Sequence, residues 1–202
     1  QVDDDLGRVR PRDRLGHHRR RGELGHLFAA DRLGVARGDR RAERGLAGGA
    51  VALDPDYMSA AVRLLSLQVE AGRLQDGYDS ARQLVARHPD SGEAHFGLSY
   101  VLRYGGLLEE SATECEQAVS RDPTNPLFRS CDAPLMLLGR HDRALDYVRL
   151  DSGSDWAMVN TRLIYQRKGM RAEAREEHAR LPPAYLRAVA PDMFYGLLSR
   201  CL

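Results

Sequence analysis

Residues 118–125 read AVSRDPTN, and closely similar octets stand 34 positions earlier as LVARHPDS (84–91) and 68 positions earlier as AVALDPDY (50–57). A fixed period of this length is typical of stacked supersecondary units, each of which is too small to bury its hydrophobic face alone. The repeat therefore predicts a linear array of similar units.

Each unit reads as two helices joined by a tight turn. Over 58–71 the apolar residues recur three or four positions apart, as one face of a helix requires. Gly72 then ends the run, as a glycine in the left-handed conformation does. A second helical pattern over 74–87 closes at Pro89, because proline cannot continue a helix. The same succession of signals returns over 92–125.

This pattern resembles the tetratricopeptide repeat, a 34-residue helix–turn–helix unit with glycine in the turn and proline at the close. The unit over 92–125 matches the family best, and the unit over 58–91 also matches it. The residues that carry the match are His95, Leu98, Gly106, Ser111, Ala118 and Pro123 in the former, and Leu64, Gly72, Gly77, Ala81 and Pro89 in the latter. Degenerate units follow over 125–152 and 155–183, so the resemblance covers residues 50–183.

The resemblance implies an all-α fold, an α-solenoid of stacked helix–turn–helix hairpins. It divides the chain into three parts. Residues 1–48 form an Arg- and Gly-rich segment, residues 49–183 form the repeat array, and residues 184–202 form a C-terminal helical segment that caps the last hairpin.

The opening segment is poorly specified. It holds twelve arginines against eight acidic residues and has no sustained hydrophobic period. Three interpretations stay open: a disordered segment, an out-of-frame translation of GC-rich coding sequence, or a degraded repeat, since Gly38 stands 34 positions before Gly72. A basic arm for nucleic acid is not favoured, because Asp residues dilute the charge and aromatic residues are nearly absent.

Charge and cysteine content bear on the class of partner and on the cellular compartment. The formal net charge is +1, which favours no class of partner. Cys115, Cys131 and Cys201 are odd in number and form no Cys-x-x-Cys pair, which argues against a disulfide scaffold and fits a reducing compartment. Cys115 is interpreted as a small buried apolar residue. No apolar run has the length of a membrane span and no signal peptide is evident, so we expect a cytoplasmic location without a membrane contact.

No motif for catalysis or cofactor binding is present. The sequence has no Gly-rich phosphate loop, no nucleophile elbow and no paired-cysteine metal signature. His17 and His18 are adjacent and would point apart on a helix, so they predict no metal site. The expectation is a protein without enzymatic activity, cofactor or metal.

The resemblance implies a non-catalytic interaction module that binds a peptide or protein partner on its concave face, which the first helix of each hairpin lines. The residues expected in this groove are Arg63, Glu70, Phe96, Tyr100, Arg103, Tyr104, Arg129, Asn160 and Arg167. Tyr100 and Arg103 are expected to matter most, and neither is assigned to the hairpin interior. The chaperone clamp of some relatives is not reproduced, since Val62 and Ser66 stand at its positions.

An alternative is the regulatory end of a larger bacterial kinase, cyclase or transcription regulator. Such repeats are often appended to these proteins, and the chain starts at Gln1 rather than Met. The identity of the partner does not follow from the sequence.

Overall fold

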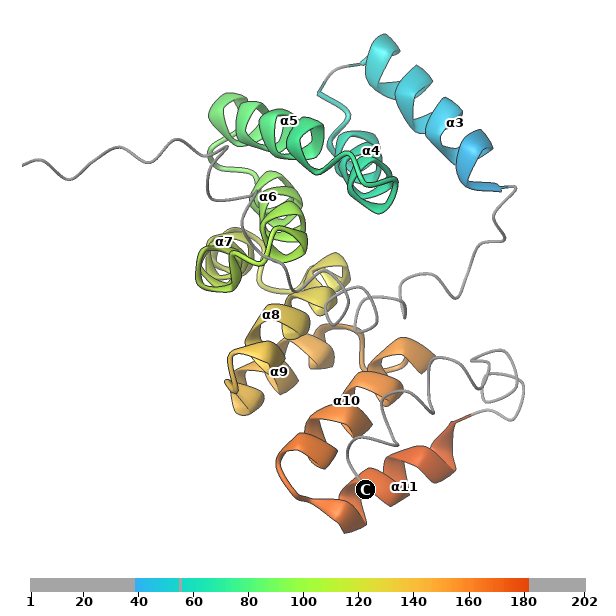
Figure 1. Ribbon diagram of the computed structural model, residues 1–202, viewed down its shortest axis with the longest axis vertical. Helices are drawn as coiled ribbons and strands as arrows, with labels where there is room; N and C mark the ends of the chain where they lie inside the picture. Colours follow the sequence, from blue (N-terminus) through green and yellow to red (C-terminus); the bar gives the residue numbers. More distant parts are fainter. Residues whose placement is uncertain (1–38, 55, 182–202) are drawn as a thin grey trace, which may run out of the picture.

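The computed structural model describes residues 39–54 and 56–181, and this part of the chain is helical with no strand. The hairpins follow one another along the long axis of the molecule (Figure 1), so the prediction of an all-α solenoid is confirmed. In chain order the elements are α3 (Asp39–Leu53), α4 (Met58–Glu70), α5 (Leu74–Arg87), α6 (Gly92–Tyr104), α7 (Leu108–Arg121), η2 (Pro126–Cys131), α8 (Asp132–Leu137), α9 (His141–Val148), η3 (Arg149–Asp151), α10 (Asp155–Arg167) and α11 (Arg171–Arg180).

Glycine makes the turn inside each hairpin. The turn glycines have φ values of 79°, 77°, 75° and 75° at Gly72, Gly106, Gly139 and Gly169. At the first, the N–H of Gly72 donates to Val69 O (2.9 Å), and the next N–H, of Arg73, donates to Gln68 O (3.0 Å). The same two bonds recur at the other three turns. They satisfy the last carbonyls of the first helix, and a residue with a Cβ adopts this positive φ only with strain.

A small residue lies five positions after each turn glycine. These residues are Gly77, Ser111, Ala144 and Ala174, and all four are buried. A Cβ on Gly77 would lie 2.9 Å from Val69 Cγ2, which is closer than side-chain packing allows. The small side chains therefore let the two helices of a hairpin approach each other closely.

Neighbouring hairpins share one continuous core. Helix α6 contacts α4 and α5 of the preceding hairpin, α7 of its own hairpin and η2 of the next. Its apolar residues, among them Phe96, Leu98 and Val101, are buried in a cluster that extends from Ala61 to Ile164. The array is thus held together by helix-to-helix burial between adjacent units.

The third hairpin departs from the regular pattern. Its first helix is split into the 3-10 helix η2 and the short helix α8. Pro134 lies in α8 and has no N–H, so it cannot donate to the carbonyl of Ser130 four residues earlier. The predicted short, degenerate unit is therefore present, but its first helix is not a single α-helix.

The first described helix begins before the boundary that the sequence indicates for the repeat array. Helix α3 spans residues 39–53 and crosses the expected boundary after residue 48. It packs against α4, which favours the interpretation that this stretch preserves part of another repeat. Residues 1–38, including His17 and His18, and the capping segment expected over 184–202 lie outside the described residues.

Candidate functional site

The nine residues predicted for the groove all lie on the first helix of a hairpin, or on η2. They are Arg63 and Glu70 in α4, Phe96, Tyr100, Arg103 and Tyr104 in α6, Arg129 in η2, and Asn160 and Arg167 in α10. Arg63 and Arg167 are exposed, whereas the other seven are half-buried or buried.

Five of these residues meet across two hairpins, and we call Glu70, Phe96, Tyr100, Arg103 and Tyr104 the aromatic–arginine cluster. The Tyr100 hydroxyl donates to Glu70 Oε1 at 3.2 Å. The guanidinium carbon of Arg103 lies 4.0 Å from the ring centroid of Tyr100 and 5.5 Å from that of Tyr104. Phe96 meets Tyr100 edge-on at a centroid distance of 6.3 Å. These cation–π and aromatic contacts hold the five side chains as one unit.

The cluster is also joined to the third hairpin. Arg103 Nη1 donates to the backbone carbonyl of Ser130 at 2.7 Å. Pro134 has no N–H to donate to this carbonyl, which accepts from a backbone N–H at the C-cap of η2 and from Arg103. Between the same two elements, the ring centroids of Phe96 and Phe128 lie 5.5 Å apart.

Burial of the cluster corrects one expectation. Tyr100 is 5% exposed and Arg103 is 2% exposed, so the assignment of both residues outside the hairpin interior is wrong. The physical reason is that α6 is packed on several sides by neighbouring helices. Within the cluster, Glu70 and Tyr104 keep more exposed surface, since both are half-buried.

Arg129 links η2 to the last hairpin. Its Nε lies 3.3 Å from Asp151 Oδ2, and its guanidinium carbon lies 5.5 Å from the ring centroid of Trp156. The Asn160 side chain donates to Trp156 O at 2.9 Å. The contacts that the structure shows for Arg129 and Asn160 are therefore with η2, η3 and α10 rather than with the cluster.

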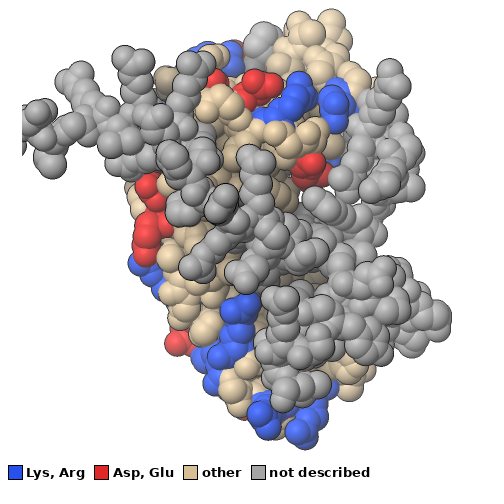
Figure 2. Space-filling view, viewed as in Figure 1, with Lys and Arg blue, Asp and Glu red and all other residues tan. Residues whose placement is uncertain are grey.

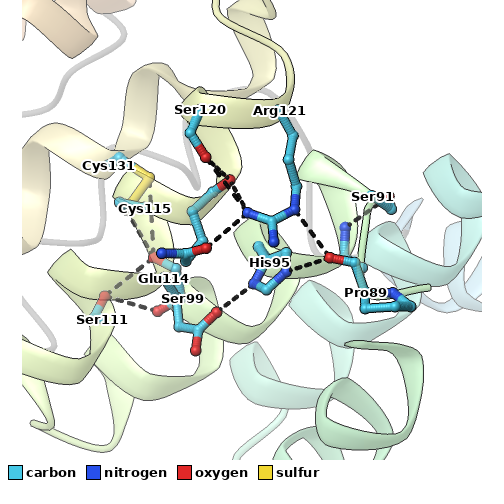
Figure 3. Close-up of polar contacts among 12 residues, drawn as sticks. Pro89, Ser91, His95, Ser99, Ser111, Glu114, Cys115, Ser120, Arg121 and Cys131 are labelled. Atoms are coloured by element: carbon cyan, nitrogen blue, oxygen red, sulfur yellow. Dashed lines mark hydrogen bonds and ion pairs between the residues drawn. A yellow bond between two sulfur atoms is a disulfide. The ribbon is translucent and has the colours of Figure 1, made fainter. Parts of the chain in front are cut away.

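The chain contains a disulfide between Cys115 in α7 and Cys131 in η2. The sequence argument against a disulfide, and the interpretation of Cys115 as a plain apolar residue, are both wrong. A separation of 16 residues along the chain carries no signal of pairing, because only the stacking of one hairpin on the next brings the two cysteines together. The hydroxyl of Ser99 lies beside both sulfur atoms (Figure 3), a role that the sequence does not reveal.

His95 connects the end of one hairpin to α7 of the next. Its Nδ1 lies 2.6 Å from Glu114 Oε2 and its Nε2 lies 2.9 Å from Pro89 O (Figure 3). The two contacts join the His95 ring to α7 on one side and to the loop that ends the preceding hairpin on the other. Arg121 Nε also donates to Pro89 O at 2.9 Å. These bonds fix the junction between the first two complete hairpins.

Two buried charged residues were not among the predictions. Asp132 in α8 is 0% exposed and Arg162 in α10 is 3% exposed. Burial lowers the pKa of Arg162, since it disfavours the charged form. Both lie in the degenerate units, where the repeat pattern gives no sign of which polar positions are buried.

Charged side chains of both signs are scattered among uncharged ones on the face shown in Figure 2. Basic side chains gather at the lower end of the view in Figure 2, where α10 and α11 lie. Within residues 39–54 and 56–181, no group of three or more His, Cys, Asp and Glu side chains is placed to hold a metal ion. A cleft of about 170 Å³ lies between α9, α10 and α11, below the size of most small-molecule sites.

The comparisons with known proteins agree on the repeat. The family model for the tetratricopeptide repeat matches residues 62–126. Among curated proteins, no sequence matches this chain. A thermophilic tetratricopeptide-repeat protein from Thermus thermophilus is similar in structure, with a TM-score of 0.61, 20% identity, and coverage of 87% of this chain and 96% of that one.

Two further solved structures show the same fold at low identity. The crystal structure of MamA has a TM-score of 0.51 and 19% identity, and covers 69% of this chain and 85% of its own. A tetratricopeptide-repeat protein from Parabacteroides merdae has a TM-score of 0.51 and 14% identity, with coverage of 78% of this chain and 63% of that one. At these identities the likeness concerns the fold alone.

Proposed function

Because the chain carries tetratricopeptide repeats, we propose that it is a non-catalytic interaction module that binds a peptide or protein partner on its concave face. In this proposal the first helices of the hairpins line the groove, and the aromatic–arginine cluster lies at its centre. The exposed Arg63 and Arg167 would contact the partner near the two ends of the groove.

The observation that supports this most is the composition of the cluster. Tyr and Arg are enriched among residues that carry binding energy, and such residues concentrate near the centre of an interface. Here Tyr100, Tyr104 and Arg103 lie together in the best-formed hairpin and are already ordered by contacts with one another. A partner would contact Tyr104, which keeps exposed surface, and little side-chain entropy is lost because the buried Tyr100 and Arg103 already hold its ring in place.

The experiment is a peptide-array screen with the full chain, followed by affinity measurements on the peptides that bind. Tyr104→Ala is the most informative single change, because Tyr104 is half-buried and its loss disturbs the core less than that of Tyr100. Loss of a central aromatic contact costs about 2 kcal/mol, so we expect affinity to fall tenfold or more. The double change Tyr100→Ala and Arg103→Ala should reduce binding further.

Gln83→Ala is the matched control, since Gln83 is exposed on the second helix α5. It should leave affinity unchanged. Each variant is compared at a temperature where circular dichroism shows full helicity, because the double change removes buried side chains. Equal losses for Tyr104→Ala and Gln83→Ala, or normal binding by both, would mean that the partner uses another surface.

The cellular location of the protein is a separate part of the proposal. No helix in the described part of the chain has the length and apolar character needed to cross a bilayer. A cytoplasmic location stays a prediction, and the Cys115–Cys131 disulfide removes one argument for it. In a reducing compartment, a disulfide is more often transient and regulated than permanent.

A further inference from the structure

The disulfide connects two hairpins at the edge of the aromatic–arginine cluster. Cys115 lies in α7 of one hairpin, and Cys131 is the last residue of η2 in the next. They are 0% and 1% exposed. The residue before Cys131 is Ser130, whose carbonyl accepts the hydrogen bond from Arg103. The covalent bond and the central arginine of the cluster thus anchor the same short segment.

That segment is a weak element with contacts on both sides. A 3-10 helix has poorer hydrogen-bond geometry than an α-helix and is rarely stable without support. In η2, Phe128 packs on Phe96 of α6, and Arg129 reaches Asp151 in η3 and Trp156 in α10. We therefore expect the position of η2 to depend on the disulfide more than that of a regular helix would.

The surroundings of the sulfur atoms also suit the reduced state. Ser99 Oγ lies 2.9 Å from Cys115 Sγ and 3.1 Å from Ser111 Oγ, and Ser111 Oγ donates to Ser99 O at 2.9 Å (Figure 3). With a free thiol, Cys115 can donate to Ser99, Ser99 to Ser111, and Ser111 to the carbonyl, so every donor in this buried chain has an acceptor. A purely apolar pocket would leave a buried thiol without such a partner.

We propose that the Cys115–Cys131 disulfide is a redox-controlled lock on η2 that sets the position of Arg103 in the aromatic–arginine cluster. This rests on the proposed function in so far as the cluster is a binding site. In the oxidised chain η2 is tied to α7 and Ser130 holds Arg103. In the reduced chain η2 is free to separate from α7, and Arg103 loses its fixed acceptor.

The chemical step is thiol–disulfide exchange with a dithiol reductant. One thiolate of the dithiol attacks a sulfur of the disulfide and forms a mixed disulfide, and its second thiolate then displaces the remaining cysteine. Two electrons pass to the chain, Cys115 and Cys131 each take up one proton, and the reductant becomes a disulfide. Because both sulfur atoms are buried, exchange requires η2 to open first, so reduction should be slow.

The first test compares the oxidised and the reduced full chain in a Cys201→Ser background, with dithiothreitol as the dithiol. Backbone hydrogen exchange should increase in 126–131 on reduction, whereas 74–87 in α5 should be unchanged. Trp156, the single tryptophan of the chain, should change its emission, because Arg129 of η2 lies over its ring. Equal protection of 126–131 in the two states would overturn the lock.

The second test isolates the role of the hydroxyl chain. Ser99→Ala removes the acceptor of the Cys115 thiol, and one hydrogen bond in a buried site is worth about a fivefold change in equilibrium. The equilibrium with dithiothreitol should therefore shift about fivefold towards the disulfide. Thr113→Ala, on the exposed side of α7, should not shift it. No shift in Ser99→Ala, or an equal shift in both variants, contradicts this account of the reduced state.

A third measurement separates this proposal from the proposed function. Peptides selected on the oxidised chain are measured again on the reduced chain, where affinity should fall about tenfold. If hydrogen exchange changes but affinity does not, the lock does not control the groove and the proposal is wrong. If no peptide binds either form, the proposed function fails, and the exchange data alone decide whether the lock exists.

Discussion

Arg103 in α6 donates to the carbonyl of Ser130 in η2 at 2.7 Å, across the boundary between two hairpins. Pro134 has no N–H to donate to this carbonyl, which therefore stays open to Arg103 beside its backbone donor at the C-cap of η2. The Arg103 guanidinium is held in place by stacking on Tyr100. A helix break in one unit is thus matched by a buried arginine in the unit before it. The central residue of the proposed groove is at the same time a structural contact.

The first prediction concerns this contact. Arg103→Met keeps much of the aliphatic volume but removes the charged donor to the Ser130 carbonyl, which keeps a backbone donor at the C-cap of η2. A hydrogen bond from a charged group contributes about 1.5–3 kcal/mol, so the free energy of unfolding should fall by that amount in urea denaturation. Arg82→Met, at an exposed position of α5, should change it little. Similar values for the two variants would mean that the Arg103–Ser130 bond adds no stability.

The second prediction tests the turns. Gly139→Ala forces an alanine to adopt a φ of 75°, which costs about 1–2 kcal/mol. Space is not the cause, because a Cβ at Gly139 meets nothing within 4 Å. Gly153→Ala is the control, since Gly153 also has open space and no positive φ. Thermal unfolding should show a lower Tm for the first variant alone; an equal decrease in both would contradict the argument from backbone conformation.

The sequence predicts the regular units well, because their signals are local. The helix expected over 74–87 coincides with α5, since a turn glycine fixes its start and His88-Pro89 fixes its end. The third hairpin is predicted only in outline. Pro126 is the first residue of η2 and Pro134 lies inside α8, and the repeat pattern does not say how the chain continues between the two prolines.

The site is predicted less completely than the fold. The family pattern places Tyr100, Arg103 and Tyr104 on one helix, and the structure brings them together with Glu70 and Phe96. Their burial was not predicted, because it depends on how the hairpins stack. The disulfide was missed for the same reason: Cys115 and Cys131 belong to different units, and sequence spacing alone does not show which positions of adjacent units meet.

The third prediction concerns the stability that the disulfide provides. The bond closes a loop with a separation of 16 residues, and a loop of this length restricts the unfolded chain by about 3 kcal/mol. In a Cys201→Ser background, the double change Cys115→Ala and Cys131→Ala should lower the free energy of unfolding by about that amount. Dithiothreitol should have a similar effect on the parent chain and none on the double variant. If dithiothreitol also lowers the stability of the double variant, the decrease does not come from reduction of the Cys115–Cys131 disulfide.

The last prediction concerns pH and the ion pair between α7 and α9. Arg143 donates to both carboxylate oxygens of Glu116, at 2.9 Å and 2.7 Å. These bonds lower the pKa of Glu116 from its usual 4.5, although partial burial acts in the opposite direction. The folded chain therefore binds a proton at Glu116 less readily than the unfolded chain does.

This difference in proton binding at Glu116 determines how the stability of the folded chain changes with pH. The stabilisation is complete above pH 4.5 and is lost as the pH falls through the lower, folded pKa. Glu116→Gln should flatten the decrease of the urea midpoint between pH 5 and pH 3, whereas the exposed Glu176→Gln should not. Because the Glu116 and Arg143 side chains are 45% and 41% exposed, the contribution is at most about 1 kcal/mol. It should also shrink in 1 M salt, which screens exposed charges. An unchanged acid profile in Glu116→Gln would show that this pair does not couple α7 to α9.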